Sequence, residues 1–311
     1  MVTKPKVLLA VDGSPQSMLS VVYVSQMVDP KQIAVELFHV KADAPEAIFD
    51  LVGEEGKTIY AEEIGQWAAE ASSNIDHFME EAEAVFINAG FPAAHVTTTI
   101  KARQTGIARD ILGESEQGYA ALVFGRTGYG ALGDYMVGSV AAKLVEAASY
   151  VPLVIVGGGI DNKKVMVAFD RSKHVREGVN QVGRLMVKGM DEMLLCHIVR
   201  PLALPSPAAS YRIQAGYDTH WLDAKTQEII PHMVEFKKRL LRLGFDQEIF
   251  RTAIVKEKIS RAKGLFDEVE MGGFGTIIIG RRGLTSVEAF SMGRVTRKLI
   301  HLATRQAIWL V

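Results

Sequence analysis

The feature that most constrains this chain is an internal repeat, because the second half of the sequence repeats the pattern of the first. Five segments recur in the same order: KVLLAVDGS (6–14) and KVMVAFDRS (164–172), LFHV (37–40) and LCHI (195–198), NAGFP (88–92) and RLGFD (242–246), VFGRTG (123–128) and IIGRRG (278–283), and PLVIV (152–156) and AIWLV (307–311). The offset between partners stays between 154 and 158 residues. The sequence therefore predicts a tandem duplication, with domains over 1–157 and 164–311 and a linker over 158–163.

Within each half, short apolar segments alternate with longer segments of helical period. The strands predicted in the first half are apolar on both faces and span 6–11, 34–40, 96–100, 120–124 and 153–156. The longest predicted helix spans 62–88, and Ser14 with Pro15 forms an N-cap and first-turn pair for the first helix. This alternation predicts an α/β fold of two tandem five-stranded, mostly parallel sheets with helices on both faces.

Composition narrows the class of partner. Of the 311 residues, 48% are hydrophobic and 23% charged, and the net charge of -1 provides no general attraction for nucleic acid or anionic lipid. A single cysteine, Cys196, rules out an intrachain disulfide, and no apolar stretch approaches the roughly 18–20 residues that a membrane span needs. We therefore expect a cytoplasmic protein whose partner is a small molecule, not nucleic acid or a membrane.

The segment FGRTGYGALGDYMVGS (124–139) contains five glycines between a predicted strand and a predicted helix. Ligands of parallel α/β sheets bind at the carboxyl ends of the strands, where a helix start offers backbone N–H groups and the positive end of its dipole. Glycines let the backbone turn with positive φ and approach phosphate oxygens closely. The segment therefore predicts an anion-binding loop.

Two common phosphate-binding motifs do not fit this loop. The Walker A pattern requires Lys and Ser or Thr where the chain has Ala131 and Leu132. A GxGxxG pattern is present at Gly128, Gly130 and Gly133, but it follows the fourth strand rather than the first. The acidic residue near the required spacing of about 20 residues also falls inside a predicted helix.

A third pattern, G-x2-G-x9-G-[ST], is formed by Gly125, Gly128, Gly138 and Ser139. With this loop, the first-strand ending AVDGS and the second-strand ending FHV, the chain resembles the universal stress protein A superfamily over nearly its whole length as two tandem domains. The resemblance implies an adenine nucleotide alpha hydrolase-like, Rossmann-like fold. It also implies that an adenine nucleotide, ATP, is the ligand, with Mg2+ bound through the phosphates and water.

The residues that the resemblance assigns to the nucleotide are Val11, Asp12, Val40, Gly125, Arg126, Gly128, Gly138 and Ser139. Asp12 would meet the adenine-ribose part, Val40 would offer backbone groups to the base, and the helix start at Ser139 would hold phosphates. Other interpretations stay open at this point. An aspartate in the position of Asp12 often only caps the following helix. Arg126 is either a phosphate partner or a solvated surface residue. The loop itself either binds a ligand or only makes a turn.

The second half departs from the pattern. Its equivalent residues are Asp170, Gly280, Gly283, Gly293 and Arg294, so an arginine stands where the pattern has Ser or Thr. Gly13 has become Arg171, and Arg281 and Arg282 add further positive charge. These changes favour loss or weakening of the ATP site over binding of a different anion through guanidinium groups.

No motif for catalysis or metal binding is visible, and the eight histidines show no metal-ligand spacing. We therefore expect a nucleotide-dependent sensor or switch in a stress response. The alternatives are a slow ATP hydrolase or self-phosphorylating protein, a dinucleotide-dependent oxidoreductase, and an interaction scaffold without nucleotide. The final strands, LVIV and IWLV, are expected to pair the halves as an internal pseudo-dimer, and whole chains to pair further as a homodimer with an unknown protein partner.

Overall fold

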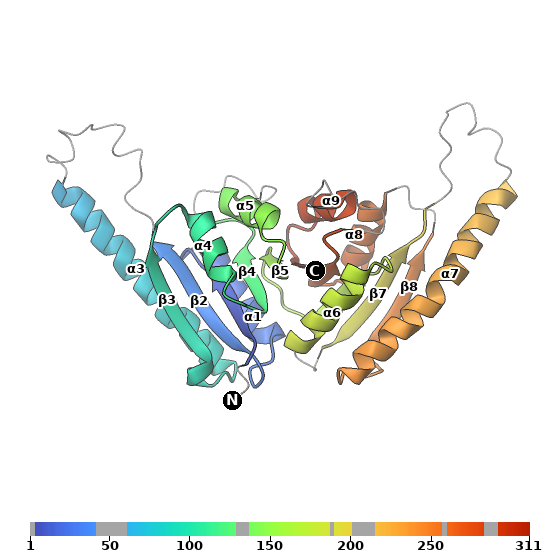
Figure 1. Ribbon diagram of the computed structural model, residues 1–311, viewed down its shortest axis with the longest axis horizontal. Coiled ribbons are helices and arrows are strands. Elements are labelled where there is room, and N and C mark those ends of the chain that lie inside the picture. The colour runs from blue at the N-terminus through green and yellow to red at the C-terminus, as the bar shows by residue number, and fades with distance from the viewer. Residues whose placement is uncertain are drawn as a thin grey trace, which may run out of the picture. The chain divides into compact units, whose positions relative to one another are not determined.

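A computed structural model of the chain describes residues 4–41, 61–128, 137–186, 190–200, 215–256, 260–282 and 292–311 (Figure 1). It divides into two compact units, Met1–Val151 and Pro152–Val311. Both are mixed α/β units in which mostly parallel strands are flanked by helices, so the predicted fold class is confirmed. The two long connections at 41–61 and 199–221 lie mostly outside the described residues.

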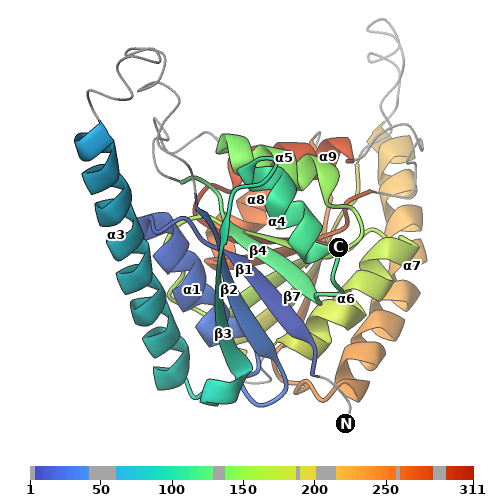
Figure 2. The ribbon, with the colours of Figure 1, turned by 60° about the vertical axis from the view of Figure 1, so that its left-hand side comes forward.

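The sheet of the first unit has the strand order β3-β2-β1-β4, and every pair is parallel (Figure 2). These strands are β1 (Lys6–Ala10), β2 (Ala34–Lys41), β3 (Val96–Ala102) and β4 (Ala121–Gly125). Helices α1 (Pro15–Met27) and α3 (Ala61–Asn88) pack together on one face of the sheet, and α4 (Ile107–Ser115) and α5 (Ser139–Ala147) on the other. A one-turn 3-10 helix, η1 (Ala93–His95), precedes β3.

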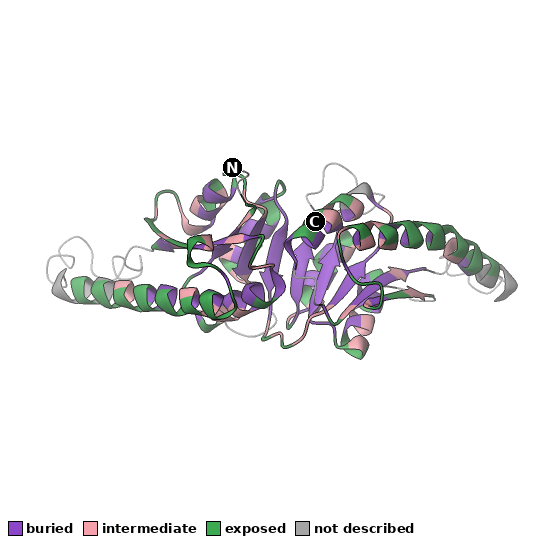
Figure 3. Ribbon diagram, turned by 90° about the horizontal axis from the view of Figure 1, so that it is seen from below, coloured by how far each residue is buried: buried purple, intermediate pink, exposed green. Residues whose placement is uncertain are grey.

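The local sequence explains these elements. As predicted, Ser14 caps α1 by accepting a hydrogen bond from the Ser17 N–H at 3.2 Å, and Pro15 occupies the first helical position. In the second half of α3, the residues Ile75, Phe78, Met79, Ala82 and Phe86 recur at spacings of three and four, and all are buried. Strands β1, β2 and β4 are mostly buried, and the helices expose their outer sides (Figure 3). The prediction that the strand at 96–100 is apolar on both faces is wrong, because β3 lies at the edge of the sheet and most of its residues after Val96 are exposed. The core of the unit therefore lies between the sheet and its two helix layers.

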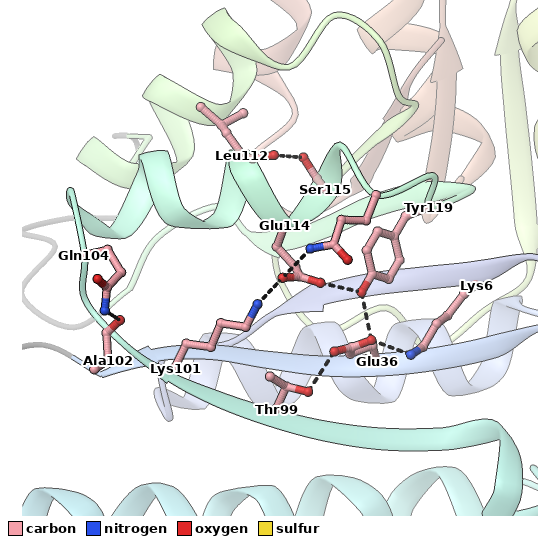
Figure 4. A network of polar contacts seen from close by, with 11 residues as sticks. Lys6, Glu36, Thr99, Lys101, Ala102, Gln104, Leu112, Glu114, Ser115 and Tyr119 are labelled. Atoms are coloured by element: carbon pink, nitrogen blue, oxygen red, sulfur yellow. Dashed lines mark hydrogen bonds and ion pairs between the residues drawn. The ribbon is translucent and has the colours of Figure 1, made fainter.

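A buried polar network ties the sheet to α4 at a distance from the loop sites (Figure 4). The Tyr119 hydroxyl lies 2.8 Å from a carboxylate oxygen of Glu36 and 2.9 Å from one of Glu114, and each carboxylate also forms an ion pair with a lysine, Lys6 or Lys101. Burial alone would raise the pKa of Glu36, but its hydrogen bonds and the charge of Lys6 lower the pKa below its ordinary value. Lys6 begins β1, so the network lies toward the amino end of that strand and is structural.

The sheet of the second unit has five parallel strands in the order β8-β7-β6-β9-β10. They are β6 (Lys164–Ala168), β7 (Glu192–Ile198), β8 (Phe250–Val255), β9 (Thr276–Ile279) and β10 (Ala307–Leu310). Strand β5 (Leu153–Val156) joins this sheet by pairing antiparallel with β10, so the LVIV and IWLV segments do pair. That antiparallel pairing places β5 in the second compact unit.

In the second unit, helices and strands alternate along the chain in the same order as in the first. The helices are α6 (Lys173–Leu185), α7 (Ala215–Arg242), α8 (Arg261–Gly272) and α9 (Arg294–Leu302). Across the described parts of both units, no helix is both long enough and apolar enough to cross a membrane.

Candidate functional site

The first candidate site begins at the turn between β1 and α1. Gly13 has a φ of 81°, a left-handed conformation that glycine adopts without strain. One carboxylate oxygen of Asp12, Oδ1, accepts hydrogen bonds from the Ser14 N–H at 3.0 Å and from the Ser17 hydroxyl at 2.6 Å. These bonds fix the orientation of the Asp12 carboxylate within the turn, while Ser14 serves as the helix cap.

The other carboxylate oxygen of Asp12 lies against the glycine loop. A Cβ atom added to Gly128 would come within 2.2 Å of Asp12 Oδ2, a distance that atoms in proteins do not tolerate. A Cβ added to Gly125 would lie 3.0 Å from the Gln16 side chain. The loop backbone therefore packs directly on the β1–α1 turn, and the structure brings together Asp12, Gly125 and Gly128 from distant parts of the sequence.

The two ends of the glycine loop are joined by a hydrogen bond. The Gly138 N–H donates to the Arg126 carbonyl oxygen at 2.9 Å, and Gly138 is the N-cap residue of α5. Glycine has no side chain with which to cap the helix, and the first helical residue, Ser139, is exposed. The N-terminal N–H groups of α5 therefore face the loop without a side-chain cap from Gly138. Residues 129–136, with Gly130 and Gly133, lie outside the described part of the chain.

The ends of β1 and β2 form the neighbouring edge of the site. The Val11 N–H donates to the Phe38 carbonyl at 2.9 Å, so the backbone groups of Phe38 face β1. Backbone groups two residues apart on a strand face the same side, so the N–H and carbonyl of Val40 point in the same direction as those of Phe38. Strand β1 ends at Ala10, so it does not extend far enough to pair with Val40. His39 donates a hydrogen bond from Nδ1 to the Val11 carbonyl at 2.8 Å and so links β2 to the end of β1. Burial lowers the pKa of its ring, which favours the neutral form.

The structure contradicts one of the two sequence-based interpretations of Arg126. Only 3% of its surface is accessible, so it is not a solvated surface residue. Burial lowers the pKa of its guanidinium group, and its carbonyl oxygen holds the loop end at Gly138. Its counterpart in the second half, Arg281, is also buried, with 8% of its surface accessible. This arginine is therefore an internal feature that both units share.

The second unit repeats the backbone of this site closely. Asp170 Oδ1 accepts from the Ser172 N–H at 2.9 Å, as Asp12 does from Ser14. The Gly293 N–H donates to the Arg281 carbonyl at 2.9 Å, and Gly293 is the N-cap residue of α9. Arg171 retains the left-handed turn with a φ of 65°, although this conformation costs a side-chain-bearing residue about 1–2 kcal/mol.

A cavity of about 810 Å³ lies in the second unit, within the range of small-molecule sites. Among the residues that line it are four of those predicted for a degenerate site, Asp170, Gly280, Gly293 and Arg294, while Gly283 falls outside the described residues. Its described lining carries two carboxylates, Asp170 and Glu228, and seven basic side chains: Arg171, Arg200, Lys225, Arg261, Arg282, Arg294 and Arg297. The cavity is therefore strongly positive.

Three of these cavity arginines, Arg200, Arg261 and Arg297, were not expected from the sequence motif. Two of them lie far from the glycine loop along the chain, at the end of β7 and at the start of α8. Arg261 and Arg297 could have been identified from the sequence by aligning the two halves and looking for charged residues that replace uncharged ones. Their counterparts in the first half, Ile107 at the start of α4 and Ala142 in α5, carry no charge.

The remaining reactive groups give no sign of catalysis. Cys196 is fully buried in β7, and burial raises the pKa of its thiol to about 12, so it stays protonated. His197 donates from Nδ1 to the Phe169 carbonyl at 2.6 Å, as His39 does to Val11. Within the described ranges, no three His, Cys, Asp or Glu side chains cluster so as to hold a metal ion.

Comparison with solved structures supports the fold over the whole chain. A universal stress protein from Archaeoglobus fulgidus DSM 4304 is 18% identical, with a TM-score of 0.59, and the alignment covers 98% of this chain and 97% of that one. A protein of unknown function from Pseudomonas aeruginosa PAO1 is 10% identical, with a TM-score of 0.55, and the alignment covers 99% and 92% of the two chains. At such identities the likeness shows the fold alone.

Comparison at the level of sequence identifies the family. None of the curated proteins matches the chain. The model of the Universal stress protein family matches residues 5–157, which include the β1–α1 turn, the glycine loop and the start of α5. Residues 5–157 therefore form a domain of the Universal stress protein family.

Proposed function

We propose that the first half binds ATP at the glycine loop and that the protein acts as a cytoplasmic, nucleotide-dependent switch in a stress response. The observation that carries this proposal is the close approach of Gly128 to Asp12, where a Cβ atom would lie 2.2 Å from Oδ2. This approach positions a carboxylate, a bare loop backbone and a helix start at one edge of the sheet. Membership of the Universal stress protein family over residues 5–157 supports a role in the stress response.

The residues at α5 suit a phosphate chain. The helix start supplies backbone N–H groups and a positive dipole end, and the exposed Ser139 hydroxyl supplies a further donor. A Cβ atom at Gly138 would lie 3.4 Å from the nearest atom, so the backbone there is accessible without being tightly packed. Mg2+ would be held by the phosphate oxygens and water, and would neutralise part of the phosphate charge.

The base and ribose would lie toward β1 and β2. The N–H and carbonyl of Val40 lie beyond the end of β1, and they could pair with the hydrogen-bond donor and acceptor groups on the edge of adenine. Asp12 Oδ2 is oriented by the bonds on Oδ1 and would accept from ribose hydroxyls. Since the guanidinium of Arg126 is buried, we assign Arg126 to the site through the carbonyl that joins the loop ends.

A switch follows from the position of the ligand. ATP that contacts both Gly128 and Ser139 would join the two sides of the loop. The nucleotide would thereby select the surface that a protein partner reads. The contacts described here orient a ligand but supply no positioned general base, so binding is the activity that they support.

Calorimetric titration of ATP and Mg2+ into the full chain tests this proposal. Gly138→Glu would place a carboxylate at the phosphate end of the site, and we expect it to abolish the ATP site of the first half. The matched control is Gly293→Glu, at the equivalent N-cap of α9, where a Cβ would meet its nearest atom at 3.5 Å. This control should leave that site intact. An unchanged number of ATP sites in folded Gly138→Glu protein, or no binding to the wild type, would refute the proposal.

A further inference from the structure

The cavity of the second unit carries more positive charge than its own carboxylates balance. Glu228 pairs with both Arg171 and Lys225, the latter at 2.7 Å, and so accounts for two of the basic groups. Five guanidinium groups remain, those of Arg200, Arg261, Arg282, Arg294 and Arg297. Within the part of the chain that the structure describes, none of these five forms a salt bridge with a carboxylate.

The five arginines form two clusters on different elements. The α9 cluster comprises Arg282, which follows β9, with Arg294 and Arg297 in the first turn of α9. The α8 cluster comprises Arg200, which follows β7, and Arg261, the first residue of α8. Both arginines line the same cavity. Burial and then the positive charge of Arg200 lower the pKa of Arg261, while the carboxylate of Asp170 acts in the opposite direction.

The sheet order fixes how far apart the strand ends that precede Arg282 and Arg200 lie. Strand β6 pairs with β9 on one side and with β7 on the other, so the two clusters flank the end of β6. Neighbouring strands are about 4.8 Å apart, which places the ends of β9 and β7 about 10 Å from each other. Asp170 and Arg171 follow β6 and occupy the middle. Arg282 and Arg200 therefore start from opposite sides of the β6 end, and a ligand that pairs with both carries anionic groups at two points.

The apolar part of the cavity lining suits a nucleoside. Trp221 lines the cavity with 37% of its surface exposed, and an aromatic face of this kind stacks on nucleobases. Its Nε1 donates to the Arg200 carbonyl at 3.4 Å, and the Lys225 amine lies 4.9 Å from the ring centroid. Phe169 and Met292 add apolar surface to the same cavity. A bare inorganic polyanion would make no use of these groups.

We propose that this cavity binds a nucleoside that carries phosphate groups at two positions, one phosphate at the α9 cluster and the other at the α8 cluster. A 5′-phosphate chain would meet the N-terminus of α9, where Gly293 leaves the first turn without a side-chain cap and Arg294 replaces the usual Ser or Thr. A phosphate at the other end of the nucleoside would pair with Arg200 and Arg261. The proposal does not depend on ATP binding in the first half.

The test compares three probes on the full chain by calorimetry: adenosine 3′,5′-bisphosphate, adenosine 5′-monophosphate and inorganic triphosphate. We expect the bisphosphate to bind at least about tenfold more tightly than the monophosphate. Arg261→Gln should remove most of that ratio, because it should weaken the bisphosphate much more than the monophosphate. Arg294→Gln should weaken both nucleotides, because both place a phosphate at α9. All variants are checked for folding by circular dichroism.

Lys298→Gln is the matched charge control, because it removes one positive charge from α9, the helix of Arg294, at an exposed residue outside the cavity lining. It should leave the ratio of affinities unchanged. The proposal fails if the two nucleotides bind equally well, or if Arg261→Gln and Lys298→Gln have the same effect. It also fails if inorganic triphosphate binds as tightly as the bisphosphate, since the nucleoside would then be irrelevant.

Discussion

The two units have nearly the same backbone at the carboxyl ends of their strands but different side chains around it. In both, an aspartate orients the first turn and a glycine N–H, Gly138 or Gly293, bonds to the carbonyl of a buried arginine at 2.9 Å. In the second unit, Arg294 stands in place of Ser139 and Arg261 in place of Ile107. The backbone of the two units is thus the same at this edge, and the proposed difference in ligand rests on the side chains around it.

The left-handed turn after the first strand shows that this backbone is maintained against a local cost. Gly13 adopts it at a φ of 81° without strain, whereas Arg171 adopts it at 65° despite its Cβ. Arg171 also forms an ion pair with Glu228 at the edge of the cavity. The turn therefore keeps its backbone conformation in both units although the side chain that adopts it differs.

The largest expected effect concerns a feature that the second unit lacks. Tyr119→Phe removes the hydroxyl that contacts the buried carboxylates Glu36 and Glu114, and we expect the free energy of unfolding to fall by about 2 kcal/mol. The repeat aligns Glu36 with an apolar residue, Leu194. Urea denaturation of the full chain measures the effect. Tyr150→Phe is the comparison variant, because the hydroxyl of this half-exposed side chain bonds to Leu112 and Ser115 and contacts no buried carboxylate, so the loss should be about 1 kcal/mol or less. Equal effects would contradict the structural role of the network.

A second prediction separates two glycines of the same loop. Gly128→Ala places a Cβ within 2.2 Å of Asp12 Oδ2, whereas Gly138→Ala places one 3.4 Å from its nearest neighbour. We expect Gly128→Ala to displace the Asp12 carboxylate and to weaken ATP binding about tenfold or more, equivalent to about 1.4 kcal/mol. Gly138→Ala should change the affinity much less. Calorimetry on the two variants measures both, and a reversed order would show that Asp12 does not contact the nucleotide.

The third prediction tests the cost of the left-handed turn directly. Gly13→Arg introduces a Cβ at a φ of 81° and should lower the free energy of unfolding by about 1 kcal/mol. Arg171→Gly relieves the same strain but removes the ion pair with Glu228 and loosens the unfolded chain, so its net effect should be smaller. The two reciprocal variants are compared by urea denaturation. A destabilisation by Arg171→Gly larger than that by Gly13→Arg would mean that Arg171 stabilises the fold itself.

The smallest effect is a shift in the pKa of His197. Burial lowers this pKa first, and the positive charges of Arg261 and Arg171 lower it further. Arg261→Gln should therefore raise the pKa of His197, which would still remain below its ordinary value because burial persists. Because the folded pKa lies below the unfolded one, the stability that neutral His197 contributes is lost as the pH falls. NMR titration measures the shift, and His39, beside Asp12 and Lys41, serves as the internal control. An unchanged His197 pKa would show that Arg261 does not act on this part of the cavity.

Much of the fold could be predicted from the sequence because its signals are local. The cap at Ser14, the helix start at Ser139 and the strand at 153–156 follow from turn chemistry and apolar runs, and all three are observed. The burial of Arg126 and the contact of Gly128 with Asp12 could not be predicted, because they depend on how distant segments pack. The α8 cluster was missed for the same reason, since neither of its arginines lies near the glycine motif.

A crystal structure of the full chain grown with ATP, Mg2+ and adenosine 3′,5′-bisphosphate would test the central claim most directly, namely that one duplicated backbone binds two different anions. We predict ATP in the first half, with its phosphates at Ser139 and its ribose at Asp12. We predict the bisphosphate in the second half, with one phosphate near Arg294 and the other near Arg261. The same nucleotide in both halves, or a second-half cavity without ligand at saturating bisphosphate, would contradict the account.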